Sequence, residues 1–549
     1  MEQVKTSIQW LWAQMRGFKQ RMMWCTLVGV LRVVASLSFV WICKIAMDVA
    51  TGKGHGNLMF LISIMIGVLL LQLLFSNLAS WQRDSNYLFI SNKLRLQLFT
   101  KTMNSSWSGR DKMHTGDVMS RMETDVETVS ASLGYDLPQS VIIVIQLMAA
   151  SAFLFILQKE LLFVLLCIMP LALLSSKLYF KTMRRLTKQV RETEGSIESL
   201  IQENLQNRIL IKAMGTLQSV IGMLVRWQGD LKSVYLRRLL FSTRSRFFVQ
   251  LGFQTGYAVT FIWGVVGIQR STVTYGMMTA FLQLVNQVQR PIVDLSRYIP
   301  KMVQTFTSVD RLRELDSLEQ EQHHEDKMLQ GQVGICIKNL TYSYPDNIAP
   351  TISDFSYDFK PGTSTAIVGE TGVGKSTLIR LILSLLKAGQ GEMKIYNESR
   401  SEVISPSTRC NFMYVPQGNS LLSGTVRDNL LLANPDATEA EMKEALDIAM
   451  AQFLDKKQGL DTLCSEKGGG LSEGQAQRIA IARAILHPGS IIILDEASSA
   501  LDVETEKKIL IALGERMKNK TLIWITHHKA VTKYMTNVLN IGACETTKV

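Results

Sequence analysis

The stretch Gly369–Thr377, GETGVGKST, decides the fold of the later part of this 549-residue chain. It follows the apolar end of a short expected strand, Ala366–Gly369, and precedes an expected helix, Leu378–Leu386. A glycine-rich loop between a strand and a helix binds phosphates, because its backbone N–H groups curl around them and the helix dipole adds positive potential. The pattern predicts an α/β P-loop ATPase domain that binds ATP. Lys375 would neutralise the β and γ phosphates, and Ser376 would ligate Mg²⁺. The predicted ATP-binding residues of the loop are Gly369, Glu370, Thr371, Gly372, Val373, Gly374, Lys375, Ser376 and Thr377.

A second apolar stretch, Ile491–Glu496 (IIILDE), ends in two adjacent acids. Its four apolar residues predict a buried strand with both acids at its end. Asp495 is expected to hold Mg²⁺ through water, and Glu496 to polarise the attacking water. A strand that merely ends in solvated acids is the simpler alternative. The P-loop upstream and the motif that lies between the two segments favour the catalytic interpretation.

The composition indicates two or three domains and a membrane. Hydrophobic residues make up 47% of the chain and charged residues 19%, but the long apolar runs all lie in the first part. The net charge of +12 could indicate a nucleic-acid partner. Here the lysines and arginines stand mostly beside apolar runs, which favours membrane topology and no nucleic-acid binding. The seven cysteines are scattered without a CxxC pair, which argues against a disulfide framework or a zinc site.

Six apolar stretches have about the 20 residues that a transmembrane helix needs. Their length and repetition exclude the buried core helices of a soluble protein. The third and fourth are separated only by the tight hairpin at Gln158–Glu160. The predicted spans are Met22–Ala50, Leu58–Ala79, Leu137–Leu157, Leu161–Phe180, Phe247–Ile268 and Val273–Val293. A six-span membrane α-helical bundle is therefore expected ahead of the ATPase domain.

The distribution of cations predicts the orientation of these spans. Clusters of lysine and arginine stand before the first span, after the second and after the fourth, whereas the alternate loops carry little beyond Lys53, Lys159 and Arg270. Positive residues stay inside, so both termini are expected in the cytoplasm. We expect a multi-pass protein of the plasma membrane, or of the cell inner membrane if the organism is a Gram-negative bacterium, with the lipid bilayer as its first partner.

The two long cytoplasmic loops have helical charge and apolar spacing and lack proline. Each is expected to extend the membrane helices as a hairpin. The turns would lie at Ser106–Gly116 and Gly215–Gly222, where glycine and polar residues gather, and would dock on the ATPase domains. The predicted domains are a membrane domain over residues 1–310, a linker over 311–328 and a nucleotide-binding domain over 329–549.

Between the P-loop and the acid pair lies LSEGQAQRIAIARAI, Leu471–Ile485. With this motif the chain resembles the ABC transporter superfamily, and in particular its exporter-type half-transporters, over essentially its whole length. The first five residues resemble the signature LSGGQ. Gln417 in VPQ resembles the Q-loop, Ser499–Asp502 the D-loop, and His527 in ITHH the switch histidine. Tyr344 resembles the aromatic residue that stacks on adenine.

The resemblance implies a sandwich in which each ATP lies between the P-loop of one subunit and the signature of the other. Ser472, Gly474 and Gln475 would then bind ATP in trans, Gln417 would contact both ATP and Mg²⁺, and His527 would join Glu496 in catalysis. One chain holds one such domain, so a second half-transporter is implied. The intact catalytic set favours a homodimer. Glu466, just before GGG and the signature, resembles an exporter-type segment that contacts the coupling helices.

Two positions depart from the family pattern. Glu473 replaces the usual third-position glycine of the signature, and an acid near a triphosphate is electrostatically unfavourable unless its side chain points away. His528 stands where arginine is common after the switch histidine. Neither change removes a chemical role.

Three functions share these motifs. An ATP-driven exporter would move a lipid, a peptide or another amphiphile out of the cytoplasm or the inner leaflet. A non-transport ABC ATPase would lack the six spans. A regulatory or channel-gating ABC ATPase usually carries degenerate sites or large added domains. The sequence favours the exporter and does not reveal its substrate.

Polar residues inside the predicted spans suggest where a substrate would bind. Arg32 lies well within the first span, where a charge facing lipid is costly. One helical face of the sixth span carries Gln283, Asn286, Gln287 and Arg290. These residues either line a wet, electropositive cavity that suits an anionic or zwitterionic amphiphile, or Arg32 pairs with an acid such as Asp294 and only holds helices together.

Overall fold

The computed structural model describes residues 2–106, 115–321, 325–344, 349–370, 372–456, 458–465, 470–527 and 529–541. For residues 165–181 and a few other positions it describes the backbone alone. The chain forms two compact units. The first consists of Met1–Thr100 and Thr115–Ser317, and the second consists of Leu318–Val549 together with the short segment that begins at Lys101.

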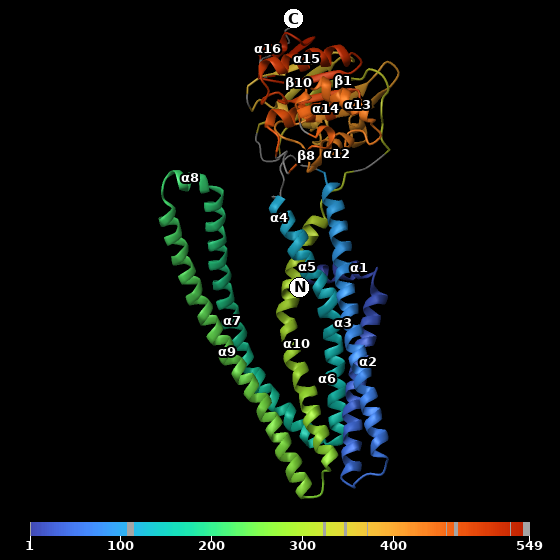
Figure 1. The fold of residues 1–549 in the computed structure, drawn as a ribbon, viewed down its shortest axis with the longest axis vertical. Helices are drawn as coiled ribbons and strands as arrows, with labels where there is room; N and C mark the ends of the chain where they lie inside the picture. Colours follow the sequence, from blue (N-terminus) through green and yellow to red (C-terminus); the bar gives the residue numbers. More distant parts are fainter. Residues whose placement is uncertain are drawn as a thin grey trace. The chain divides into compact units, whose positions relative to one another are not determined.

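The described residues of the first unit form long helices joined by short turns (Figure 1). Two π-helical turns, Arg121–Asp125 and Ser132–Asp136, join α4, α5 and α6 into one continuous helical stretch. The helices are α1 (Glu2–Met15), α2 (Lys19–Ala50), α3 (Leu58–Met103), α4 (Thr115–Ser120), α5 (Val126–Ala131), α6 (Leu137–Leu157), α7 (Lys159–Gln206), α8 (Arg208–Ala213), α9 (Leu217–Gln269) and α10 (Tyr275–Asp316).

Five of the predicted spans fall within long helices, and the sixth, Val273–Val293, begins two residues before α10; the number six is not confirmed. Within the described residues, four helical stretches are long and apolar enough to cross a membrane: Lys19–Ala50, Leu58–Met103, Thr115–Leu157 and Leu217–Gln269. The apolar part of α7 coincides largely with residues 165–181, whose side chains are not described. The span expected in α10 contains the polar residues named above, which lower its hydropathy. The fourth and sixth spans therefore remain predictions.

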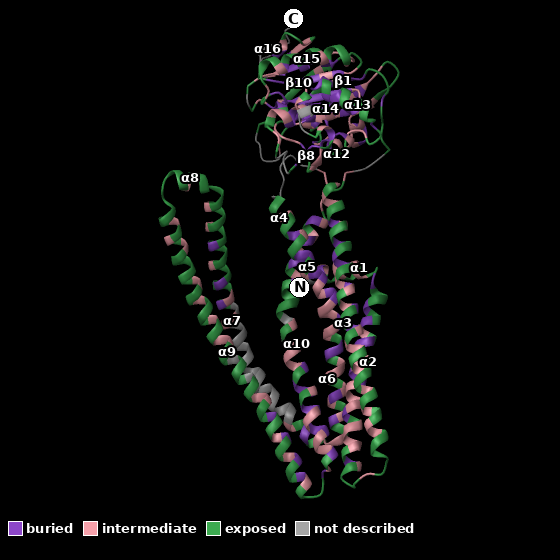
Figure 2. Cartoon of the chain, in the orientation of Figure 1, coloured by how far each residue is buried: buried purple, intermediate pink, exposed green. Residues whose placement is uncertain are grey.

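The buried and exposed side chains of the first unit are distributed as expected for helices that face lipid. Large apolar side chains on α3, such as Leu70, Leu73 and Leu74, are each at least 60% exposed. A smaller buried cluster, which includes Val40 of α2, Leu154 of α6 and Leu284 of α10, holds these helices together (Figure 2). Apolar surface of this extent is unfavourable in water and favourable in a bilayer, so the exposed faces mark a membrane surface.

Helices α7 and α9 lie side by side and are joined through α8 (Figure 1). The turn is shorter than expected, because α9 already begins at Leu217 and Gly222 lies inside it. Within the expected turn, Gly215 alone adopts a left-handed backbone conformation, with φ of 66°. Most of the other expected turn, Ser106–Gly116, lies outside the described residues.

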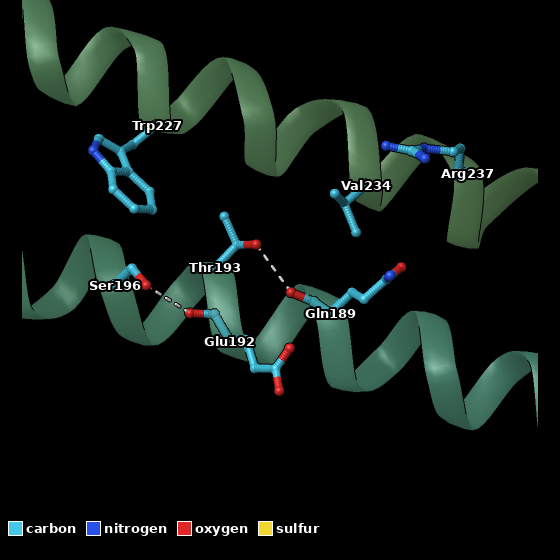
Figure 3. A pocket seen from close by; sticks show the side chains of 7 residues that line it. All are labelled: Gln189, Glu192, Thr193, Ser196, Trp227, Val234 and Arg237. Carbon is cyan, nitrogen blue, oxygen red and sulfur yellow. Dashed lines mark hydrogen bonds between the residues drawn. The ribbon is translucent and has the colours of Figure 1, made fainter.

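A hollow of about 330 Å³ between α7 and α9 is lined by Trp227 and Val234 of α9 and by polar residues of α7 (Figure 3). The hydroxyls there are satisfied within their own helix, since Thr193 donates to the carbonyl of Gln189 at 2.9 Å and Ser196 to that of Glu192 at 3.0 Å. The hollow is therefore a packing irregularity of the hairpin and not a convergent polar site.

The second unit contains the predicted α/β domain. A five-stranded parallel sheet has the order β11-β3-β10-β9-β6, and a four-stranded antiparallel sheet has the order β2-β1-β4-β5. The strands are β1 (Gly334–Tyr342), β2 (Ile352–Phe359), β3 (Ser364–Val368), β4 (Gln390–Tyr396), β5 (Ser401–Val403), β6 (Phe412–Val415), β7 (Gly424–Thr425), β8 (Leu463–Cys464), β9 (Ile491–Asp495), β10 (Thr521–Ile525) and β11 (Asn537–Asn540). The α-helices are α11 (Lys375–Ile382), α12 (Val426–Leu431), α13 (Glu439–Ile448), α14 (Glu473–Leu486), α15 (Val503–Arg516) and α16 (Lys529–Thr532).

The parallel sheet forms the centre of this unit. All five residues of β9 are buried, as a continuous apolar run in a parallel strand predicts. Helix α11 packs Ile379 and Leu381 into the same core as Ile493 of β9 and Ile525 of β10. This packing fixes the loops that leave the carboxyl ends of the strands.

Candidate nucleotide site

The predicted ATP-site residues follow four neighbouring strands of the parallel sheet. The P-loop follows β3, His527 follows β10, Asp495 and Glu496 end β9, and Gln417 follows β6. In a parallel sheet these strand ends lie along one edge, where α/β proteins bind their ligands. The fold thus brings together segments that are far apart in the sequence.

The P-loop has an open backbone. Gly372 and Gly374 adopt φ of 87° and 102°, a region that favours glycine. A Cβ at Gly372 would meet nothing within 4 Å, so the space above the loop is free. Lys375 is buried and donates from Nζ to the carbonyl oxygens of Gly369 at 2.7 Å and Glu370 at 2.9 Å. Thr371, also predicted in the site, lies outside the described residues.

Glu496 is held by two side chains from other strands. Its Oε1 lies 2.8 Å from Nε2 of His527, and its Oε2 accepts a hydrogen bond of 2.6 Å from Nε2 of Gln417. Its backbone has φ of 47°, which is uncommon for a residue other than glycine and concentrates at functional sites. The three predicted residues therefore form one cluster around a single carboxylate.

Asp495 is buried beside this cluster. The hydroxyl of Tyr414, on β6, donates to its Oδ2 at 3.1 Å. Burial raises the pKa of the Asp495 carboxyl above its usual range, and the hydrogen bond from Tyr414 opposes that shift. The sequence analysis missed Tyr414, although it stands three residues before Gln417 in the strand that leads to the Q-loop.

The donors near Asp495 suit Mg²⁺. The Ser376 hydroxyl is exposed, and the NH₂ group of Gln417 is committed to Glu496, which leaves its amide oxygen available. Hydroxyl, amide and carboxylate oxygens are the hard ligands that Mg²⁺ prefers. The predicted set of Ser376, Gln417 and Asp495 is chemically consistent with this ion.

Tyr344 lies next to the P-loop helix. Its hydroxyl is 3.2 Å from Oγ1 of Thr377, and its ring packs edge-on against Tyr342 at 5.1 Å between centroids. The residues that follow it, 345–348, are outside the described part of the chain. Tyr344 is thus beside the loop that would hold the phosphates.

The signature residues contact one another and none of the cluster around Glu496 among the described residues. The hydroxyl of Ser472 accepts from the backbone N–H of Gln475 at 3.3 Å, and the Gln475 side chain accepts from the N–H of Ser472 at 3.1 Å. This capping box fixes the start of α14. Ser472 and Gln475 therefore present a preformed helix N-terminus.

The same helix is attached to the D-loop. A Cβ at Gly474 would come within 2.6 Å of the Ala500 carbonyl oxygen, so this position requires glycine. Gln477 donates to Oγ of Ser499 at 3.2 Å and accepts from the N–H of Ala500 at 3.2 Å. Gln477 was also missed by the sequence analysis, since it lies beyond the five signature residues. Glu466 and His528 are outside the described residues.

Comparison with known proteins places this arrangement in a family. Residues 22–292 match the family model of the ABC transporter transmembrane region, and residues 352–499 match the family model described as ABC transporter. The chain belongs to the ABC transporter family, with the architecture of an exporter-type half-transporter. It is an integral membrane protein that binds nucleotide, and its ATPase drives export.

Individual relatives agree over most of the chain. An uncharacterized ABC transporter ATP-binding protein of Bacillus subtilis is 27% identical, with 98% of this chain and 92% of the relative covered. An ATP-dependent lipid A-core flippase of Aliivibrio fischeri is 26% identical, with 82% and 78% covered. The solved structure of a bacterial Atm1-family ABC exporter with ATP bound has the same fold, with a TM-score of 0.79, 21% identity, and 96% and 95% of the two chains covered.

Proposed function

We propose that two copies of this chain form a homodimeric exporter for an anionic or zwitterionic amphiphile. The observation that carries the substrate class is the guanidinium set, Arg32, Arg83 and Arg290, for which the described residues of the membrane unit provide no acidic partner. ATP binding would close the two nucleotide-binding domains on each other, and hydrolysis would reopen them.

In this mechanism Glu496 is the general base for the attacking water. Gln417 and His527 orient its carboxylate, as their hydrogen bonds to its two oxygens suggest. Lys375 would leave the carbonyl oxygens of the P-loop and bind the β and γ phosphates. Bound Mg²⁺, held by Ser376, Gln417 and Asp495, would supply charge neutralisation at the phosphate oxygens. Tyr344 would stack on the adenine.

The signature would act on the nucleotide of the second subunit. Its capping box and the N-terminus of α14 form a positive helix end, which suits a γ-phosphate. The hydrogen bonds of Gln477 to Ser499 and Ala500 would couple the position of that helix end to the position of the D-loop. Since all catalytic residues are present in this chain, two copies complete two equal sites.

The guanidinium set lies in the membrane unit. Among described residues, no carboxylate oxygen is within 4 Å of Arg32, Arg83 or Arg290. Asp294, the alternative partner of Arg32, lies 3.5 Å from Arg297 instead. Arg83 donates to Gln139 at 3.0 Å. An anionic group bound among these arginines would be stabilised by their positive charge.

Polar atoms on α10 support a wet lining. The side-chain NH₂ of Gln287 donates to Oγ of Ser36 at 3.1 Å, while its Oε1 is buried with no partner among the described residues. A buried polar atom of this kind is costly unless water or a ligand satisfies it. Asn286 and Arg290 are exposed in the single chain. We therefore place the headgroup of the substrate near Arg32, Arg83 and Arg290.

The predicted topology completes the proposal. Both termini and the α7–α9 hairpin tip are cytoplasmic, in the plasma membrane or a bacterial inner membrane. The tip carries Ile209 at 77%, Leu210 at 57% and Met214 at 65% exposure. An apolar tip of this kind is suited to dock on an ATPase domain.

The test is substrate-stimulated ATPase activity and transport in proteoliposomes, with panels of anionic, zwitterionic and cationic amphiphiles. Arg32→Gln and Arg290→Gln should abolish stimulation by anionic compounds and leave basal ATPase activity intact. Arg270→Gln, at the end of α9, is the matched control. Unchanged stimulation by every active compound in both variants and in the double variant would contradict the proposed substrate class.

A further inference from the structure

A groove of about 720 Å³ lies between α1, α2 and α6, and its lining includes none of Arg32, Arg83 and Arg290. Its walls are apolar side chains apart from Lys19, Gln20 and Thr26. The lining residues that matter most here are Trp12, Lys19, Trp24, Leu27 and Val141. Of these, Trp12, Trp24, Leu27 and Val141 are between 41% and 58% exposed. An open apolar groove of this size has the dimensions of a ligand site.

Helix α1, which forms one wall of the groove, is attached to α10 by side-chain hydrogen bonds. Ser7 donates to Oδ1 of Asp310 at 2.6 Å, and the indole N–H of Trp10 donates to Oδ2 of Asp316 at 3.0 Å. Arg313 donates to the hydroxyl of Thr6 at 3.0 Å. These hydrogen bonds attach α1 to the end of α10. Because Trp12 belongs to α1, it is held in place beside the groove.

The groove has a positive rim. Nζ of Lys19 lies 4.7 Å from the ring centroid of Trp12, and no carboxylate is within 4 Å of it among described residues. Arg16 and Arg21 are exposed on either side of Lys19 in the sequence. Tryptophan and cationic side chains gather where a bilayer meets water. The rim therefore complements a phosphate at the headgroup level, with the apolar walls directed along a membrane helix.

We propose that this groove binds an anionic phospholipid of the cytoplasmic leaflet, with its phosphate against Lys19 and an acyl chain along Trp24, Leu27 and Val141. A second copy of the chain is a poorer occupant, because two identical rims would bring like charges together. Since α1 also holds the end of α10, the bound lipid would stabilise the helix that leads out of the membrane unit.

The experiment titrates the delipidated full-length dimer in detergent with phosphatidylglycerol or phosphatidylcholine and counts bound lipids by native mass spectrometry. We expect one tight phosphatidylglycerol site per chain and weaker binding of phosphatidylcholine. Lys19→Gln should lower the affinity for phosphatidylglycerol about fivefold, the contribution of one cation near an anionic headgroup. Arg16→Gln, a neighbouring cation that does not line the groove, is the control and should stay within about twofold of the unmodified protein.

A second pair of variants tests the groove itself. Val141→Trp fills it and should remove the tight site, whereas Val144→Trp, exposed on the same helix but outside the groove, should retain it. Equal binding of the two lipids, or an equal loss in Lys19→Gln and Arg16→Gln, would mean surface electrostatics alone and would overturn the proposal. Dissociation of the dimer in Val141→Trp, with lipid binding unchanged, would assign the groove to the second copy instead.

Discussion

The two halves of the nucleotide site differ in how far a single chain completes them. Around Glu496, side chains from the segments that follow β6, β9 and β10 hold one another at distances of 2.6 and 2.8 Å. Around Ser472, the side chains of Ser472 and Gln475 bond, within the part of the chain that the structure describes, only to the first turn of α14. The catalytic half is therefore held by the loops that follow the sheet strands, and the signature half is a preformed helix end, whose ligand would come from the second subunit in the proposed dimer.

This difference predicts that substitutions in the two halves impair different steps of the ATPase cycle. Changes in the catalytic half should impair chemistry or nucleotide binding in the chain that carries them. Changes in the signature half should act on closure of the dimer. Comparison of single-chain binding with dimer turnover can therefore distinguish the two halves.

The largest effect is expected from Glu496→Gln. Removal of the general base should lower ATP turnover about a hundredfold or more and leave ATP binding intact, because glutamine keeps the shape of the side chain. The measurement is steady-state hydrolysis beside equilibrium binding of a fluorescent ATP analogue. Turnover equal to that of the unmodified protein would remove Glu496 from its role.

Lys375→Ala should weaken ATP binding itself. The ammonium group would make charge-assisted hydrogen bonds to phosphates, and their loss corresponds to about a tenfold to hundredfold drop in affinity. Equilibrium binding to the isolated dimer at fixed Mg²⁺ measures it. Arg380→Lys, on the same helix beyond the loop, is a control for helix disruption. Equal ATP affinity in Lys375→Ala and the unmodified protein would contradict the assignment.

Ser472 has a structural and a functional role that two substitutions separate. Ser472→Ala removes both the N-cap of α14, worth about 1 kcal/mol of stability, and the hydroxyl offered in trans. Ser472→Asn retains a good N-cap and loses only the hydroxyl. We expect about tenfold lower turnover in both variants, with a reduced thermal midpoint only in the alanine variant. Normal turnover in the asparagine variant would mean that Ser472 acts only as the N-cap of α14 and that its hydroxyl has no role in turnover.

The sequence predicted the ATPase unit well because its chemistry resides in contiguous motifs. The P-loop and the acid pair each follow a strand, as expected, and the Q-loop glutamine and the switch histidine also follow strands. What could not be predicted is how side chains from different strands pair. The bonds of Glu496 to Gln417 and His527, and of Tyr414 to Asp495, depend on the strand order, which no local pattern encodes.

The membrane unit was less predictable, because its side-chain contacts also join segments that are far apart in the sequence. Helical periodicity located the long helices, but not the buried ion network that joins them. Arg121 is 8% exposed and contacts Asp117, Glu314 and the Arg311 carbonyl at 2.9, 2.6 and 2.7 Å. It belongs to a π-helical turn, which shifts the side chains relative to an α-helix. An arginine in a polar helical stretch gives no sequence signal of such burial.

The smallest effect is expected at Glu473, where the sequence departs from the family pattern. Its side chain is exposed in the first turn of α14, where a negative charge favours the helix dipole but opposes an incoming phosphate. Glu473→Gln removes the charge and keeps the helix geometry, so it should promote ATP-dependent dimer closure about two- to fivefold, in line with one screened surface charge. The measurement is the ATP concentration at half-maximal turnover at low and high salt. Glu504→Gln, in the first turn of α15, is the matched control. The gain should shrink as salt screens the charge. A gain that is independent of salt, or an equal gain in the control, would mean that Glu473 does not act on the phosphate, and that its side chain points away from the closed site.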